Sequence, residues 1–561
     1  MAARPLNKMG RMAIVDCLMR AERKVFMKHI KKAVTLFLAF AMVLAMSVSV
    51  FAADPTTYTI TIKKAESDKA AHTYGAYQLF KGDLAEENGK KVLSNIQWGD
   101  NVDSAEVITA LNALDGFAIP TNASAKDVAK AIGEKNYSND SVGAKALADA
   151  LGGVVSDTPK GTASIAASAT SGTISGLPAG YYLVKDDAAV ADEGAKTRYI
   201  LEVVSNVEVT EKGDVPTVDK TVGTEKKNVA DYNVGDPVPY TITGTLPSNF
   251  ADYKTYKTYT FTDTMSAGLT PPAANAVTVM VGEDVITDLF DVAVNGQTIT
   301  VSLKSGVDLK TATHGAEKTA FTADDQIVVS YSATLNNSAV VGGTGNINTV
   351  NLQFSNNPNS NGEGDKGKTP DDKTVVFTYT IEALKVEADG EPITQAQYDA
   401  LDAEDKADYV KVGDKWQKTK ALSGAGFTLY RKNDQGGWVA VGDEITGVTT
   451  FTFERVDAGD YKLVETTVPA GYNKCDDILI NVAASYTNDE PPQIDKLTVT
   501  PASAGFVANK ATGVVSGKIL NESGSTLPST GGVGTVIFYT LGSLLVIGCG
   551  IVLISRKRTN N

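Results

Sequence analysis

Apolar and polar residues alternate over short segments through most of this chain of 561 residues. Near the start, single threonines separate Tyr58, Ile60 and Ile62. A period of two places successive side chains on opposite faces of a β-strand. Because such strands recur without the regular helices of a βαβ fold, the sequence predicts a mainly β protein built from tandem β-sandwiches.

The predicted strands fall into three blocks, of which the first closes near Lys212. Within it, apolar residues recur at helical spacing from Ser104 to Leu151, and Ser104 and Ser124 are possible N-caps. We therefore expect a small helical insertion in the first block.

The second block opens at Thr217–Val222 and closes at Asn348–Phe354. The segment from Ser355 to Asp372 is dense in Asn, Gly, Asp and Lys, which indicates an exposed linker. The third block runs from Val375 to Asn521 and contains a polar helical stretch around Thr394–Leu401.

The N-terminal end has the pattern of a secretory signal peptide. Three lysines between residues 28 and 32 precede an apolar segment from Ala33 to Phe51, and Ala52 and Ala53 follow. Because Met27 immediately precedes this pattern, residues 1–26 are either an extension of the signal peptide or the product of a misassigned start codon.

The C-terminal end combines the pentapeptide Leu527-Pro528-Ser529-Thr530-Gly531, an apolar run from Val533 to Ile554 and the basic tail Arg556-Lys557-Arg558. An apolar run of about 20 residues is long enough to cross a membrane as a helix, and a basic tail stays on the cytoplasmic side. The combination resembles the LPxTG signal that sortases read. It implies transient membrane anchoring, cleavage after Thr530 and attachment to the peptidoglycan of a Gram-positive cell.

Together these patterns predict six segments. They are a signal peptide with a possible start-codon extension (1–53), an N-terminal domain with a helical insertion (54–213), a middle sandwich domain (214–358), a linker (359–373), a C-terminal sandwich domain (374–526), and the sorting signal with a transmembrane helix and basic tail (527–561).

Composition excludes several classes of function. The net charge of −14 argues against a nucleic-acid partner, which would need basic patches. Of three cysteines only Cys475 lies in the exported domains, so no disulfide is expected there. Three scattered histidines make a metal site improbable. No nucleophile elbow, zinc-ligand spacing or phosphate-binding glycine loop is present, so we expect neither an enzyme nor a cofactor.

Two segments of the third block resemble a known family. Gly424–Tyr430, and the segment Tyr461–Tyr472 that contains Leu463-Val464-Glu465, are similar to a Cna-B type domain and its E-box. With the two end signals, the resemblance implies a backbone subunit of a sortase-assembled pilus, with immunoglobulin-like domains of the Cna-A/Cna-B type.

Members of that family form internal isopeptide bonds between a lysine on the first strand and an asparagine on the last, assisted by a buried carboxyl group. Burial favours a neutral amine and a protonated acid. The amine attacks the amide carbon while the acid polarises its oxygen, and ammonia leaves. In the third block the resemblance implies Lys385, Asn521 and Glu465.

In the second block it implies Lys220, Asn348 and Asp263, with Asn351 as a rival for Asn348. These two asparagines lie three apart on one strand, so only one of them faces inward. In the first block Lys185 occupies the position of the acid. No internal bond is therefore predicted there, although a pairing of Lys63 or Lys64 with Asn206 stays open.

Polymerisation of such subunits requires a lysine that accepts the sortase-bound Thr530. Val207–Gly213 resembles the pilin motif V-x-V-Y-P-K-N in its valine spacing and its lysine, but lacks the Tyr, Pro and Asn. The resemblance implies Lys212 as acceptor, with Lys220 as the runner-up. Expected partners are a sortase, identical subunits, peptidoglycan, accessory pilins and host ligands. The alternative is a monomeric wall-anchored adhesin or a minor pilin that binds a host ligand.

Overall fold

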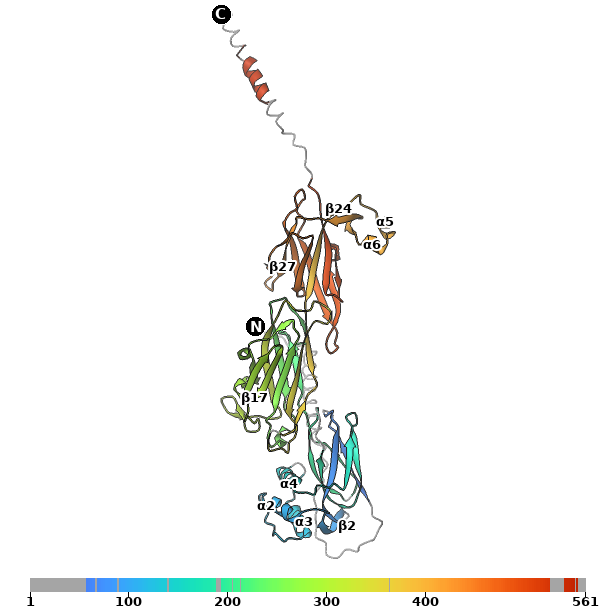
Figure 1. Ribbon diagram of the computed structural model, residues 1–561, viewed down its shortest axis with the longest axis vertical. Helices are drawn as coiled ribbons and strands as arrows, with labels where there is room; N and C mark the ends of the chain where they lie inside the picture. Colours follow the sequence, from blue (N-terminus) through green and yellow to red (C-terminus); the bar gives the residue numbers. More distant parts are fainter. Residues whose placement is uncertain are drawn as a thin grey trace, which may run out of the picture.

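The computed structural model describes residues 57–65, 68–87, 90–138, 141–187, 193–203, 205–211, 213–362, 364–524, 539–549 and 551–552. Within these ranges the strands form three pairs of sheets that follow one another along the length of the molecule (Figure 1). The predicted mainly β class is confirmed. The predicted signal peptide, Lys212 and the LPSTG pentapeptide lie outside the described residues.

The first pair of sheets is formed by the N-terminal block. The smaller sheet has the order β5 (Ser171–Leu177), β1 (Tyr58–Lys63), β8 (Val207–Thr210), and the larger has the order β3 (Lys90–Trp98), β2 (His72–Glu87), β6 (Gly180–Asp186), β7 (Arg198–Val203), with β4 (Gly161–Ile165) beside β2. Alternating burial along β1 explains its fold, because Tyr58, Ile60 and Ile62 enter the core between the sheets.

The expected helical insertion consists of α2 (Ser104–Asn112), α3 (Ala125–Glu134) and α4 (Val142–Gly152), which lie together at one end of the first pair of sheets (Figure 1). Ser124 caps α3 as expected, in a capping box with Asp127. The prediction that Ser104 is an N-cap is wrong, because Asp103 accepts hydrogen bonds from the first turn of α2. Both residue types cap helices well, so their order along the chain could not distinguish them.

The second pair of sheets encloses the largest described apolar core, which includes Phe261 and Tyr259. One sheet has the order β10 (Val229–Asp231), β23 (Asp372–Phe377), β21 (Asn346–Ser355), β12 (Tyr259–Met265), β17 (Thr298–Leu303), β16 (Phe290–Asn295), with β22 (Lys366–Lys368) beside β21. The other has the order β15 (Asp284–Val285), β14 (Thr278–Val281), β20 (Gln326–Leu335), β11 (Pro237–Thr245), β9 (Val218–Val222), with β13 (Leu269–Thr270) beside β20. The hairpin of β18 (Thr313–His314) and β19 (Thr319–Ala320) and the 3-10 helices η1 (Phe250–Asp252), η2 (Ala274–Ala276) and η3 (Thr287–Leu289) lie in its loops.

The structure differs from the expected linker at 359–373. Strand β22 and the start of β23 lie in this segment, and both pair with β21 of the second pair of sheets. These strands are short and lie in a polar segment. A search for alternating apolar residues therefore does not detect them.

The third pair of sheets has its core around Phe427 and Tyr461. One sheet has the order β25 (Tyr409–Val412), β26 (Lys415–Ala421), β24 (Tyr379–Ala388), β35 (Val514–Asn521), β34 (Phe506–Asn509), with β30 (Thr450–Val456) beside β24. The other has the order β28 (Trp438–Ala440), β27 (Gly426–Lys432), β31 (Gly459–Thr467), β32 (Ile478–Tyr486), β33 (Ile494–Thr500), with β29 (Ile445–Thr446) beside β27; η4 (Ala502–Ala504) follows β33.

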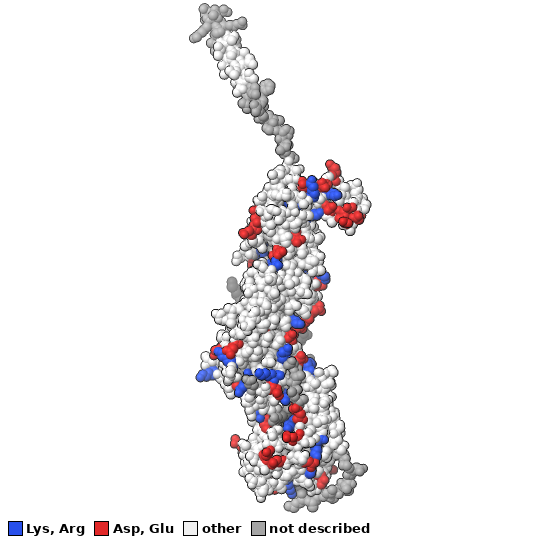
Figure 2. Space-filling view, in the orientation of Figure 1, with Lys and Arg blue, Asp and Glu red and all other residues white. Residues whose placement is uncertain are grey.

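An arm projects from the side of the third pair of sheets (Figure 1). It carries α5 (Gln395–Asp399), which lies in the predicted polar helical stretch and is capped by Thr394, and α6 (Ala403–Lys406). Side chains of both charges gather on this arm (Figure 2). On the face shown there, Lys and Arg are interspersed with Asp and Glu.

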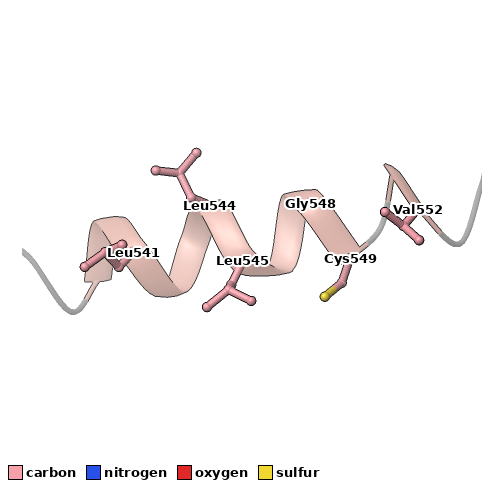
Figure 3. A pocket seen from close by; sticks show the side chains of 6 residues that line it. All are labelled: Leu541, Leu544, Leu545, Gly548, Cys549 and Val552. Carbon is pink, nitrogen blue, oxygen red and sulfur yellow. The ribbon is translucent and has the colours of Figure 1, made fainter.

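The C-terminal apolar run is described only in part, as helical residues 539–549 and 551–552. Leu541, Leu544 and Leu545 project from this single helix (Figure 3), and all are more than half exposed. None of the described helices combines the length and the apolar character that a membrane crossing needs.

Candidate functional site

The three residues predicted for the C-terminal domain meet in its core. Lys385 lies on β24 and Asn521 on the neighbouring parallel strand β35, whereas Glu465 reaches them from β31 of the facing sheet. Lys385 Nζ donates to Asn521 Oδ1 at 2.5 Å and lies 3.1 Å from Glu465 Oε1. Asn521 Nδ2 donates to the same carboxylate oxygen at 2.9 Å. All three side chains are buried.

The arrangement brings together the groups that amide transfer needs, but the carboxyl group contacts the amide nitrogen and not the amide oxygen that it was expected to polarise. The lysine nitrogen contacts the amide group of Asn521, and the carboxyl group contacts both the amine and the amide nitrogen that would leave as ammonia. The second oxygen of Glu465 accepts from the backbone N–H of Cys475 at 2.8 Å, which fixes the orientation of the carboxyl group. Burial raises the pKa of the Cys475 thiol to about 11, so it stays neutral beside this cluster.

A second cluster lies in the core of the middle domain. Lys220 on β9 points from one sheet toward Asp263 on β12 of the other, with Nζ 2.7 Å from Asp263 Oδ1. Both side chains are buried. Burial lowers the pKa of Lys220, while Asp263 opposes the shift without cancelling it. The direction favours the neutral amine that a nucleophilic lysine requires.

The middle cluster contains a residue that the sequence analysis did not select. Tyr331 on β20 accepts from Lys220 Nζ at 3.1 Å and from Asn348 Nδ2 at 2.8 Å, and it donates to Asp263 Oδ2. Its hydroxyl group therefore connects all three predicted residues. Strand alternation places Tyr331 on the inward face with Ile327 and Val329. The sequence therefore indicated that Tyr331 is buried, but nothing in the pattern indicated a role in the reaction.

The structure distinguishes the two rival asparagines of β21. Asn348 is fully buried in the cluster, and its Oδ1 has no hydrogen-bond partner among the described residues. Asn351 is only partly buried and donates to Asp371 Oδ1 at 3.0 Å, away from Lys220. Asn348 therefore shares the Tyr331 hydroxyl group with Lys220, whereas Asn351 contacts Asp371.

The lysines considered in the first domain have other contacts. Lys185 lies over the ring of Tyr77, at 4.2 Å from Nζ to the ring centroid. Lys63 pairs with Glu208 at 2.6 Å, and Lys64 donates to backbone oxygens. Asn206 accepts from the backbone of Thr59. The described part of this domain thus brings none of these lysines to Asn206.

Family models match three parts of the chain. Residues 234–358 match the Gram-positive pilin backbone subunit 2, Cna-B-like domain. Residues 408–490 match the prealbumin-like fold domain, and residues 520–561 match the LPXTG cell wall anchor motif. The first model describes a structural pilin subunit rather than an enzyme.

Individual proteins are also similar to this chain. The trypsin-resistant surface T6 protein of Streptococcus pyogenes serotype M6 is 25% identical over 387 residues, which cover 62% of this chain and 70% of that protein. The solved T6 backbone pilin of that serotype covers 84% of this chain and 100% of its own at 17% identity and a TM-score of 0.46. The match to the full-length major pilin SpaD of Corynebacterium diphtheriae covers 84% of this chain and 98% of that pilin, at 18% identity and a TM-score of 0.41.

The family matches lie in a consistent order along the chain. The pilin backbone domain precedes the prealbumin-like domain, and the wall anchor is last. The anchor indicates the cell wall and surface of a Gram-positive bacterium as the location. The chain is a backbone pilin of Gram-positive pili that carries an LPXTG cell-wall anchor.

Proposed function

We propose that this chain polymerises by a sortase reaction that joins Thr530 of one subunit to Lys212 of the next. The observation that carries the proposal is the wall-anchor match at residues 520–561 on a chain that also matches a pilin backbone domain. In the sequence Lys212 directly follows Glu211, and residues 211–217 separate β8 of the first pair of sheets from β9 of the second. Because the middle and C-terminal domains separate this acceptor from the donor Thr530 in the sequence, repeated transfer would extend a fibre.

The reaction conserves atoms and charge. A sortase cysteine thiolate attacks the carbonyl carbon of Thr530, the bond to Gly531 breaks, and the C-terminal fragment leaves with a new amino group. Lys212 Nζ then attacks the thioester, which forms an amide bond and releases the thiolate. The apolar C-terminal run would hold the chain at the membrane until cleavage. At the base of the fibre, an amine of a peptidoglycan precursor replaces Lys212.

The two buried clusters give such a fibre its internal bonds. Transfer from Asn521 to Lys385 Nζ and from Asn348 to Lys220 Nζ would each release one ammonia molecule. The chain catalyses these bonds once, in itself, and has no turnover. The proposed bonds suit an exported protein in which a disulfide between its domains is not expected.

The position of the C-terminal cluster matters for tension along the fibre. Strands β24 and β35 are parallel neighbours, so pulling on the two ends of this domain loads them in shear. A covalent bond between Lys385 and Asn521 would transmit that load between these two strands directly. The chain between these two residues, which are 136 positions apart, would then remain folded under tension.

The polymerisation step is tested in the producing cell, with and without its sortase. Wall extracts of the wild type should give a ladder of covalent multimers on denaturing gels. Lys212→Arg and Thr530→Ala should remove the ladder, whereas Lys226→Arg, at an exposed lysine of the middle domain, should retain it. A ladder that persists in Lys212→Arg would exclude this acceptor, and a wild type without multimers would favour the monomeric adhesin.

A further inference from the structure

A buried histidine of the first domain lies among three carboxylates. His72 begins β2, Asp186 ends β6, Asp68 precedes β2 in the loop after β1, and Glu211 follows β8. The side chains of all four residues are buried. The sequence analysis predicted no metal site because the histidines are scattered. The fold instead supplies carboxylates from distant segments to one histidine.

The two nitrogens of the His72 ring have different surroundings. Nδ1 lies 2.6 Å from Asp186 Oδ2 in a hydrogen bond. Nε2 lies 3.1 Å from Asp68 Oδ2 and 3.8 Å from Glu211 Oε1, yet it has no hydrogen-bond partner of acceptable geometry. The Nε2 atom of this buried imidazole therefore lies near two carboxylate oxygens without a hydrogen bond of its own.

These separations suit a metal ion. The ligand atoms of Asp68, His72 and Glu211 all lie within 4.8 Å of one another. Zinc binds imidazole nitrogen and carboxylate oxygen at about 2.0–2.2 Å, which places neighbouring ligand atoms in a tetrahedron about 3.3–3.6 Å apart. The hydrogen bond from Nδ1 to a carboxylate is the arrangement that orients a metal-bound histidine.

The carboxylates are themselves held in place. Asp68 accepts from the backbone N–H of Ala70 at 2.8 Å and from that of Ala195 at 3.1 Å. Glu211 accepts from the hydroxyl group of Tyr74 at 2.8 Å. Such outer hydrogen bonds orient the ligands of a metal before it binds.

Charge also favours an ion at this position. One imidazolium against three buried carboxylates leaves an excess of two negative charges, and unpaired buried charge is costly. A divalent cation on a neutral imidazole leaves an excess of only one while every carboxylate stays ionised.

We propose that Asp68, His72 and Glu211 bind a divalent transition-metal ion of the zinc type, with Asp186 as a positioning residue for the imidazole. Imidazole among the ligands favours zinc over calcium or magnesium, which prefer oxygen. The ion would join the loop after β1 to the segment after β8. It would thus connect the two ends of the domain in which Lys185 replaces the acid of an internal bond.

The test uses the exported chain, residues 54–530, stripped with EDTA and titrated with Zn²⁺ in a calorimeter. We expect one tight site and a rise in the melting temperature of the first domain on saturation. His72→Gln and Glu211→Gln should each weaken binding by at least about 100-fold, and Asp186→Asn by about 10–100-fold. His314→Gln is the matched control, because His314 also pairs with an aspartate, at 2.8 Å in the middle domain.

Two results would overturn the proposal. One is a stripped wild type that takes up no Zn²⁺, which decides the matter even if a variant fails to fold. The other is binding that survives in both His72→Gln and Glu211→Gln, or that His314→Gln removes. Neither result depends on polymerisation, so the metal site and the pilus function fail or stand separately.

Discussion

Replacing Lys385 by methionine removes the proposed nucleophile of the C-terminal domain while keeping an unbranched side chain in the core. The Nζ atom lies 5.2 Å from the centre of the Phe427 ring, so an apolar replacement has an aromatic neighbour to pack against. Glu465 would retain its hydrogen bonds from Asn521 and from the backbone of Cys475. The main loss is therefore the covalent link itself.

The magnitude follows from the length of chain that the link closes. Lys385 and Asn521 are 136 residues apart. Chain-entropy theory gives about 5 kcal/mol for a cross-link over such a loop, because the link restricts the unfolded chain. For a domain of this size each kcal/mol shifts the melting temperature by about 2–4 °C, so the variant should melt about 10–20 °C lower.

Calorimetry of the ectodomain, together with its intact mass, measures both effects. The mass deficit of the variant should be smaller than that of the wild type by one ammonia molecule, and its C-terminal domain should melt at a lower temperature. Lys462→Met is the matched control, because Lys462 lies on β31 of the same domain and pairs only loosely with Asp477, at 3.7 Å. An unchanged mass deficit in Lys385→Met, or a lost deficit with no change in melting, would refute the reasoning.

Three further predictions concern the middle domain. Tyr331→Phe should slow formation of its bond at least about 10-fold in refolding followed by mass, because the hydroxyl group connects the amine, acid and amide; an unchanged rate contradicts this role. Asn348→Ala should abolish the bond and Asn351→Ala should keep it, and the reverse result would reassign the pair. In Asn348→Ala, Lys220 stays a free amine, and burial lowers its pKa in the folded state. Between that lowered pKa and the usual value near 10.5, the unfolded chain therefore binds more protons than the folded chain. Its folding stability should rise with pH through that window in urea titrations, relative to the wild type, and a flat difference would show that Lys220 is not the titrating group.

The sequence predicted the C-terminal cluster because its chemistry follows strand order. Glu465 stands in a segment that resembles a known motif, Lys385 and Asn521 stand on the first and last strands of the block, and inward strand positions brought the three together. Tyr331 was not selected because an inward tyrosine is usually core. The cluster around His72 could not be predicted, because its carboxylates meet only when the loop after β1 and the segment after β8 fold together.

Burial in the folded structure also distinguished residues that the sequence alone could not distinguish. Asn348 and Asn351 differ only in which face of β21 they occupy, and that depends on the register of β21 with β12 and β23. The short strands β22 and β23 within a polar segment depended in the same way on pairing across the sheet. Contacts between distant strands, rather than local pattern, decided each of these cases.

The internal bonds are the central claim, and the intact mass of the ectodomain from Asp54 to Thr526 under denaturing conditions tests it most directly. Denaturation removes any bound ion, so the mass reports covalent structure alone. We predict a mass below that of the sequence by two ammonia molecules, one restored by Lys385→Met and the other by Lys220→Met. A wild-type mass equal to that of the unmodified sequence would contradict both bonds.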